Sequence, residues 1–125
     1  MHREVLYAKI HRAVVTECDP DYVGSITLDP ILLDATGMLP NEKVLIADVT
    51  GGNRFETYIL EGERGSGACK INGAAARLTS VGNVVLVLSF CWLEASELAS
   101  HRPRVAICAP DNSVDDILEY EPSVR

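Results

Sequence analysis

Ser25 follows a glycine in the segment YVGSITLD, residues 22–29, where its hydroxyl could attack the carbonyl carbon of the residue before it. Gly24 has no Cβ, so its carbonyl is open to that hydroxyl and its backbone can adopt strained dihedral angles. The dipeptide alone does not predict self-cleavage, because a turn glycine before a strand serine is a more ordinary explanation. Gly65-Ser66 repeats the pair inside ERGSGA, where a plain turn explains it.

A second set of reactive groups lies in the segment RFETY, residues 54–58. Arg54 can pair with a carboxylate through two parallel hydrogen bonds, and Tyr58 can deliver a proton. In an ideal strand these two side chains share one face and Thr57 points to the other, so all three reach one site only where the strand bends or meets a barrel mouth. By itself the segment is more ordinarily an exposed arginine and a half-buried tyrosine on a strand.

Two further segments could contribute cations and backbone donors. Lys9 and His11 are two residues apart and therefore share one face of a strand, for which a solvated surface is the ordinary alternative. The segment NGAAA, residues 72–76, offers backbone N–H groups without bulk, and it is equally compatible with the start of a helix.

The composition indicates one small domain. A chain of 125 residues can bury one core and is too short for two full-sized ones, so we expect a single domain over residues 1–125. Hydrophobic residues make up 47% of the chain and aromatic residues only 6%, which favours a core of Val, Leu, Ile and Ala in closely packed strands.

Charge and cysteine spacing argue against several classes of function. The net charge of −7 argues against a nucleic-acid partner, although a few converging cations could still bind a small anion. The four cysteines form no C-x-x-C pair and have no histidine at ligand spacing, so we expect no metal site. The charged N-terminus and the lack of a bilayer-length apolar stretch predict no membrane association, and hence a cytoplasmic protein with reduced thiols.

The local patterns predict strands and a short helix joined by tight turns. Asp29 can cap a two-turn helix that begins at Pro30 and ends at Gly37 in a left-handed conformation. The turn TGGN, residues 50–53, predicts a hairpin because its two glycines can supply positive φ angles. We expect strands over residues 5–16, 25–28, 43–49, 54–60, 68–72, 84–92 and 104–108, and helical turns over 72–78 and 93–101.

These elements predict a mainly β fold with short helices. Six or so short strands in a chain of this length favour a small closed barrel. Residues 110–125 form an acidic tail after the last expected strand, and we expect it either to be loose or to dock on a neighbouring protomer.

The ordered motifs resemble the family of pyruvoyl-dependent aspartate 1-decarboxylases. The similarity runs from KIHRAVVT through YVGS, NEKVLIADVTGGNRFETYILEGERGSG and INGAAARL to VGNVVLVLSF. The series is far more specific than any one motif. The resemblance implies a six-stranded double-psi β-barrel and a homotetramer with sites between protomers. It also implies conversion of L-aspartate to β-alanine and CO2 for pantothenate (vitamin B5) and coenzyme A biosynthesis.

The resemblance further implies that Ser25 becomes a covalent cofactor. Its hydroxyl would attack the Gly24 carbonyl in an N-to-O acyl shift, and elimination and hydrolysis would leave a pyruvoyl group, with the chain cut into residues 1–24 and 25–125. Decarboxylation through a Schiff base needs a carbonyl as electron sink, which no standard side chain offers. A short chain without a phosphate cradle favours this route over pyridoxal phosphate. A helper protein for maturation is neither implied nor excluded.

The family pattern also assigns roles to the remaining candidates. Arg54 would pair with the carboxylate that stays on the substrate, and Lys9 would assist it. Tyr58 would protonate the carbanion, while Thr57 would bond the Gly24 oxygen during cleavage and later contact the substrate. The other assignments are His11 near the cleavage site, Asn72 beside the maturation intermediate, and Gly73, Ala74 and Ala75 as a substrate-binding loop.

Two positions depart from the family pattern. Ala47 stands where some members carry a tryptophan near the site, which changes the expected shape of the pocket. Asn83 replaces a more common aspartate, and both residue types suit a turn.

Two other classes of function fit part of the sequence. One is a catalytically silent barrel that keeps Ser25 intact and binds a small anion through Lys9 and Arg54; a chain that stays uncleaved after prolonged warm incubation would favour it. The other is a serine hydrolase built from Ser25, His11 and Asp29, although no G-x-S-x-G motif surrounds Ser25.

Overall fold

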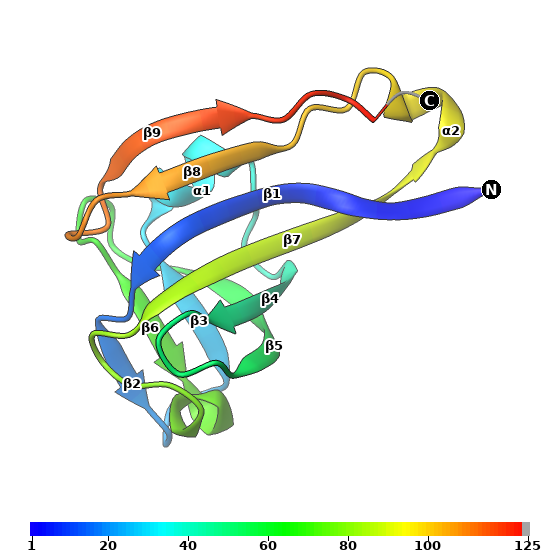
Figure 1. The fold of residues 1–125 in the computed structure, drawn as a ribbon. Helices are drawn as coiled ribbons and strands as arrows, with labels where there is room; N and C mark the ends of the chain where they lie inside the picture. Colours follow the sequence, from blue (N-terminus) through cyan, green and yellow to red (C-terminus); the bar gives the residue numbers. More distant parts are fainter. Residues whose placement is uncertain (124–125) are drawn as a thin grey trace.

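A computed structural model describes residues 1–123 and shows a mainly β protein with short helices, which confirms the predicted fold class. The strands lie side by side in the order β2-β6-β3-β5-β4-β7-β1-β8-β9 (Figure 1). The helices are α1 (Pro30–Thr36), the 3₁₀ helix η1 (Gly73–Arg77) and α2 (Ala95–Leu98). The strands are β1 (His2–Val14), β2 (Glu17–Asp19), β3 (Ser25–Leu28), β4 (Lys43–Asp48), β5 (Arg54–Glu61), β6 (Cys69–Asn72), β7 (Val84–Glu94), β8 (Arg104–Cys108) and β9 (Val114–Glu119).

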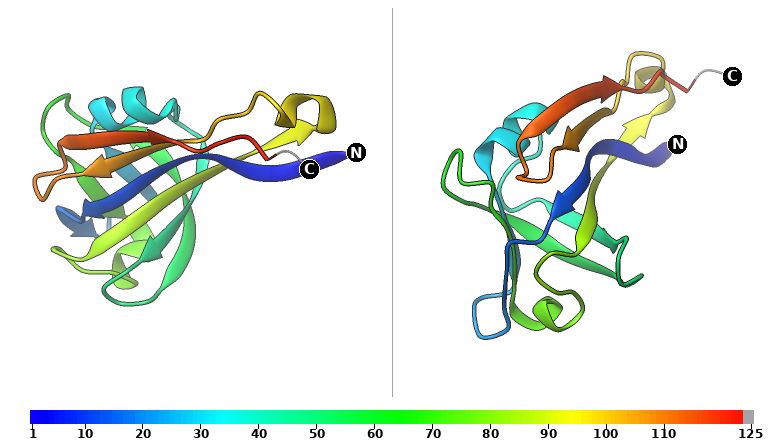
Figure 2. Two further views of the ribbon diagram at one scale, coloured as in Figure 1. Left: turned by 45° about the horizontal axis from the view of Figure 1, so that its top comes forward. Right: turned by 60° about the vertical axis from the view of Figure 1, so that its left-hand side comes forward.

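The curved sheet wraps around an apolar core (Figure 2). Successive side chains of a strand point to opposite faces, so in β1 Ala8 and Ile10 are fully buried while Lys9 and His11 lie half-buried on the other face, as predicted. Burial of a large aliphatic side chain contributes about 1.5–3 kcal/mol. The fully buried isoleucines of the core are Ile10, Ile26, Ile46, Ile59 and Ile71.

Among residues 1–123 the structure has nine strands, more than the six or so of the predicted barrel: it contains the seven ranges expected as strands and adds β2 and β9, which were not expected. β9 pairs antiparallel with β8, so the expectation of a loose tail is wrong for Val114–Glu119, whereas docking on a neighbouring protomer stays a prediction; residues 124 and 125 lie outside the described part of the chain. Five of the six β9 residues are exposed, so β9 has no buried face and therefore no alternating apolar pattern in its sequence. The strand forms through its hydrogen bonds to the edge of β8.

The predicted ends of α1 are confirmed. Asp29 Oδ1 accepts the N–H of Ile31 at 2.9 Å, Pro30 opens the helix, and Gly37 closes it with a φ of 81°. Since the capping residues are adjacent to the helix in sequence, both ends of α1 can be recognised from the sequence.

The predicted β4–β5 hairpin is also confirmed, with one difference. Gly52 takes a positive φ of 84°, whereas Gly51 is outside the left-handed region and its N–H donates to Asp48 Oδ1 at 2.8 Å.

Among residues 1–123, no helix combines the length and the apolar content needed to cross a bilayer.

Candidate active site

Ser25 is the first residue of β3 and is fully buried beside the end of β6. The two strands are antiparallel, and their register pairs Ser25 with Asn72. Asn72 Nδ2 donates to Ser25 Oγ at 2.9 Å and to Thr27 Oγ1 at 3.1 Å. Ser25 Oγ in turn donates to the Val23 carbonyl at 3.1 Å. The serine oxygen therefore lies between one fixed donor and one acceptor, and the predicted Asn72 is its neighbour.

Gly24 lies against the start of η1. Gly73 has a φ of 77°, and a Cβ there would lie 2.5 Å from Gly24 Cα and 2.9 Å from Gly24 N. Gly24 itself is outside the left-handed region, and a Cβ on it would meet only the Asn72 carbonyl oxygen, at 4.0 Å. The glycine that this contact requires is therefore Gly73.

Thr57 and Tyr58 belong to β5, the strand that pairs with β3. β3 and β5 are parallel, with Ile26 beside Ile59. Tyr58 directly precedes Ile59 on β5, and Ser25 directly precedes Ile26 on β3. Both side chains are half-buried. The parallel pairing thus places β5 beside the strand that begins with Ser25, while Thr57 and Tyr58, as neighbours on β5, point to opposite faces.

The three predicted cationic or basic groups lie elsewhere on the sheet. Arg54 is exposed at the first position of β5 and pairs with Ala47 of β4. Lys9 and His11 belong to β1, which β7, β4 and β5 separate from β3 in the strand order. Within residues 1–123, no hydrogen bond links these three side chains to the Ser25–Asn72 pair.

His11 is partly buried at a bulge in β1. The register with β7 shifts between Ile10 and Ala13, where Arg12 takes a φ of 66°. Burial, with the charges of Lys9 and Arg12, lowers the pKa of His11, so the neutral imidazole is favoured. Its Nδ1 is buried without a hydrogen-bond partner among the described residues. A bulge commonly re-aims a side chain next to a functional site.

The carboxylate of Asp29 accepts hydrogen bonds from three backbone N–H groups, and among the described residues no hydrogen bond joins it to His11. Its Oδ1 accepts from Ile31 N at 2.9 Å and Gly65 N at 3.1 Å, and its Oδ2 accepts from Gly67 N at 2.9 Å. Burial acts to raise the pKa of Asp29, but these three bonds and the charge of a nearby arginine lower it overall. The serine hydrolase interpretation is therefore wrong in its choice of Asp29.

The substrate loop predicted at residues 73–75 coincides with η1. Gly73 is buried, Ala74 is exposed and Ala75 is half-buried. The first N–H groups of such a helix have no partner within it, so the binding of substrate by this segment stays a prediction.

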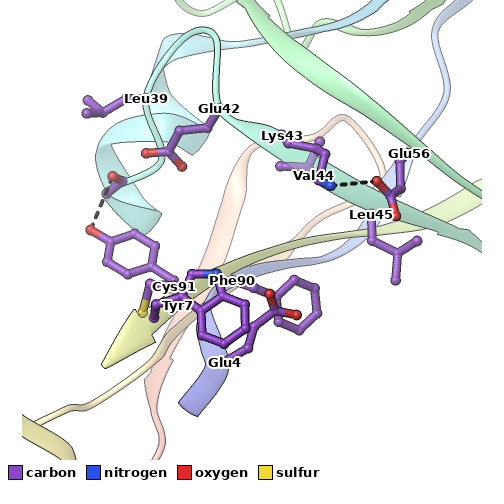
Figure 3. Close-up of a pocket in the computed structure, with 12 residues that line it drawn as sticks. Glu4, Tyr7, Leu39, Glu42, Lys43, Val44, Leu45, Glu56, Phe90 and Cys91 are labelled. Atoms are coloured by element: carbon purple, nitrogen blue, oxygen red, sulfur yellow. Dashed lines mark hydrogen bonds and ion pairs between the residues drawn. The ribbon is translucent and has the colours of Figure 1, made fainter. Parts of the chain in front are cut away.

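One large hollow among residues 1–123 lies away from Ser25. A cavity of about 690 Å³ lies over β4 and β7 and contains the Lys43–Glu56 ion pair at 2.9 Å, together with the exposed rings of Phe90 and Trp92 (Figure 3). A second cavity, of about 400 Å³, is lined by Thr27 and Asn72 and so adjoins the Ser25 group. The other residues that line it are Glu17, Asp19, Tyr22, Leu60, Glu61 and Lys70.

Comparison with known proteins identifies the family. The family model described as Aspartate decarboxylase matches residues 1–115. The chain belongs to the aspartate decarboxylase family. It is 52% identical over 122 residues to the aspartate 1-decarboxylase of Neisseria meningitidis serogroup C / serotype 2a, covering 98% of this chain and 96% of that protein. It is 49% identical over 123 residues to that of Bacillus subtilis strain 168, covering 98% and 97%.

Two features of this aspartate decarboxylase family member were missed from the sequence. Thr27 shares the amide of Asn72 with Ser25, and its position two residues after Ser25 on the same strand face was an available signal. Asp48 organises the hairpin before Arg54, and its place just ahead of a TGGN turn was an equally available one.

Proposed function

We propose that the chain is a self-processing aspartate 1-decarboxylase that converts L-aspartate to β-alanine and CO2 with a pyruvoyl group made from Ser25. Its proposed setting is the cytoplasmic synthesis of pantothenate and coenzyme A. The single observation that carries the proposal is the hydrogen bond from Asn72 to the buried Ser25 Oγ, directly after Gly24. Relatives named aspartate 1-decarboxylase, with about half of their residues identical to this chain, support it.

The residues at Gly24–Ser25 fit a self-cleaving bond. An N–H donated to Oγ stabilises the negative charge that develops on this oxygen as its proton leaves. Oγ attacks the Gly24 carbonyl carbon, the Gly24–Ser25 C–N bond breaks, and an ester forms. Elimination then releases the Gly24 carboxylate, and uptake of one water with loss of one ammonia leaves the new carbonyl. Thr57 of β5, the strand that pairs with β3, is the proposed donor to the Gly24 carbonyl oxygen.

The pyruvoyl group supplies a carbonyl that can take up a substrate amine and the electron pair released with CO2. The remaining tasks fall to side chains. Arg54 pairs with the carboxylate that stays on the substrate, and Lys9 adds a second positive charge. Tyr58 of β5 delivers a proton to the substrate carbon. The N–H groups of Gly73, Ala74 and Ala75 bind substrate oxygens.

The proposed enzyme is a homotetramer whose sites lie between protomers. Support comes from the strand order, which separates Lys9 and His11 from Ser25 within one chain. The cavity beside Asn72 is lined by three carboxylates and one ammonium, a poor site for an anionic amino acid without further cations. We expect sedimentation of about four chains of 13.6 kDa. A monomer that turns over aspartate at full rate would contradict this assembly.

The proposed activity is tested by comparing the wild-type protein with Ser25→Ala. We expect wild type to release β-alanine from L-aspartate without added pyridoxal phosphate or metal, and Ser25→Ala to remain one chain and release none. We also expect aspartate to be preferred over glutamate, because a clamp at Arg54 fixes the distance to the distal carboxylate. An uncleaved, inactive wild-type chain would instead favour the silent anion-binding barrel.

A further inference from the structure

Asp29 lies at the far end of the strand that Ser25 begins. β3 starts at Ser25, and Asp29 directly follows its last residue. The Asp29 N–H donates to the Ala68 carbonyl at 3.0 Å, which extends the antiparallel β3–β6 pairing by one more bond. The hydrogen bond from Asn72 to Ser25 Oγ lies at the opposite end of the same pairing. The two short strands therefore have Asp29 at one end and the proposed cleavage site at the other.

The carboxylate of Asp29 holds the segment that connects β5 to β6, residues 62–68, which we call the β5–β6 loop. In the sheet β3 lies between these two strands, parallel to β5 and antiparallel to β6, so the loop passes over the end of β3 where Asp29 lies. The buried carboxylate accepts from Gly65 N at 3.1 Å and from Gly67 N at 2.9 Å. Asp29 thus attaches the end of β3 to the loop that leads into β6.

The β5–β6 loop is also bonded to the turn between β8 and β9. Asn112 Nδ2 donates to the Gly67 carbonyl and to the Val14 carbonyl, both at 2.8 Å. Gly67 has a φ of 70°, and a Cβ on it would lie 2.5 Å from the Asp111 carbonyl oxygen, so the loop packs closely on this turn. Since the loop is connected to the end of β1 as well, it is a fixed support to which Asp29 attaches β3.

We propose that Asp29 is a positioning residue for self-cleavage: by holding the β5–β6 loop, it fixes the position of β6 along β3 so that Asn72 meets Ser25. The proposal rests on the proposed function, since it assigns the cleavage to Ser25. All of these contacts are made within one chain, so this positioning needs no neighbouring protomer.

The register of β3 and β6 has no short turn to set it, because β3 ends at Leu28 and β6 begins at Cys69. The apolar core fixes which face of each strand is buried, with Ile26 opposite Ile71. The geometry of a reacting group, however, is sensitive to displacements of about 1 Å, which a core contact tolerates better than a set of hydrogen bonds does. A carboxylate bonded at the end of a four-residue strand supplies that finer control.

Three residue types at position 29 separate the loop bonds from the helix cap. Asp, Asn and Ser cap helices about equally well, so α1 keeps its cap in Asp29→Asn and in Asp29→Ser. The amide of Asp29→Asn keeps one oxygen for Ile31 and Gly65, but its nitrogen cannot accept from Gly67. The shorter hydroxyl of Asp29→Ser does not reach the loop. The series therefore removes first one and then both of the side-chain bonds to the loop.

The experiment measures the fraction of cut chain against time by mass spectrometry, at a temperature where circular dichroism shows each variant to be folded. We expect cleavage to slow by about threefold in Asp29→Asn and by about 10–100-fold in Asp29→Ser, as Asn72 loses its position against Ser25. A role confined to capping α1 predicts equal rates for all three residue types. If Asp29→Ser does not fold, the comparison of Asp29→Asn with wild type still decides.

Thr36→Ala is the matched control, because it removes a buried hydroxyl that bonds the Leu32 carbonyl at 2.8 Å in the same helix and makes no bond to the β5–β6 loop. It should lower the melting temperature and leave the cleavage rate unchanged. Equal cleavage rates in wild type and the folded Asp29 variants, or an equal slowing in Thr36→Ala, would overturn the proposal. A wild-type chain that stays uncut would instead refute the proposed self-cleavage, so the two failures are distinguishable.

Discussion

The amide of Asn72 has both of its N–H bonds in use, one to Ser25 Oγ and one to Thr27 Oγ1. Asn72→Asp keeps the shape of this side chain but replaces the donor with an acceptor, so the serine oxygen loses the group that stabilises its negative charge. We expect cleavage to slow by about 10²-fold, on the scale of removing one oxyanion donor. The measurement is the fraction of cut chain against time by mass spectrometry.

Thr27→Val is the control for this substitution, because it removes the second acceptor of Asn72 and leaves the bond to Ser25 in place. It should cleave at close to the wild-type rate. Equal rates for Asn72→Asp and wild type would show that the amide plays no part in maturation.

A substitution at Tyr58 can separate chain cleavage from decarboxylation, the two reactions of the proposed site. Its proton is needed after CO2 leaves and not before the chain is cut. Tyr58→Phe keeps the half-buried ring and removes only the hydroxyl. We expect a fully processed chain whose β-alanine release is slower by about 10²–10⁴-fold, the usual loss for a general acid. That corresponds to about 3–5 kcal/mol of barrier. Cleavage and β-alanine are measured on one sample.

Two outcomes would contradict this role for Tyr58. An uncleaved variant would assign the hydroxyl to maturation. A cleaved variant with full activity would show that the proton comes from another source, with water the first to examine.

At the scale of elements, the contact between η1 and Gly24, the residue before β3, depends on Gly73. Gly73→Ala adds a Cβ 2.5 Å from Gly24 Cα to a residue with a φ of 77°. We expect lower stability and little or no cleavage, because the chain before Ser25 must shift. Gly65→Ala is the matched control: its φ is 82°, but no atom lies within 4 Å of the added Cβ. Normal cleavage in Gly73→Ala, by mass spectrometry, would count against the contact.

Asp29 connects α1 to the turn before β6 and makes stability depend on pH. Its pKa is lowered in the fold, against about 3.9 in an unfolded chain. The folded state therefore binds this proton less readily, so the stabilisation is full above about pH 4 and is lost as pH falls through the lower folded value. Asp29→Asn should reduce the melting temperature most at neutral pH, with the difference from wild type shrinking toward pH 2. A difference that is constant with pH would contradict the assignment.

Elements with local chemistry were predictable from the sequence, and those without it were not. The caps at Asp29 and Gly37 and the turn at Gly52 define α1 and the first hairpin through their own side chains and φ angles. β2 has three residues, and β9 is exposed on both faces, so neither carries the alternating pattern by which a strand is recognised. β2 forms through its hydrogen bonds to β6, and β9 forms through its hydrogen bonds to β8.

At the scale of the whole molecule, the candidate site was only partly predictable. The family resemblance named Asn72, and the β3–β6 pairing brings it to Ser25 across 47 residues of sequence. No local pattern could place Lys9 or Arg54, since their distance from Ser25 depends on the strand order and, in the homotetramer that we propose, on the neighbouring protomer. The place of Asp48 ahead of a turn was a local signal for its bonds to the hairpin, but its bonds to Thr79 and Asn83, 31 and 35 residues away, had none.

The central claim is that this chain cuts itself between Gly24 and Ser25 and keeps the product as its cofactor, and an intact mass spectrum of the purified protein tests it most directly. The account predicts one fragment of residues 1–24 and one of residues 25–125 with a blocked N-terminus. Because one water is gained and one ammonia lost, the two masses should sum to within about one dalton of the uncut chain. A single uncut mass, or a free N-terminal serine throughout a folded sample, would contradict the claim.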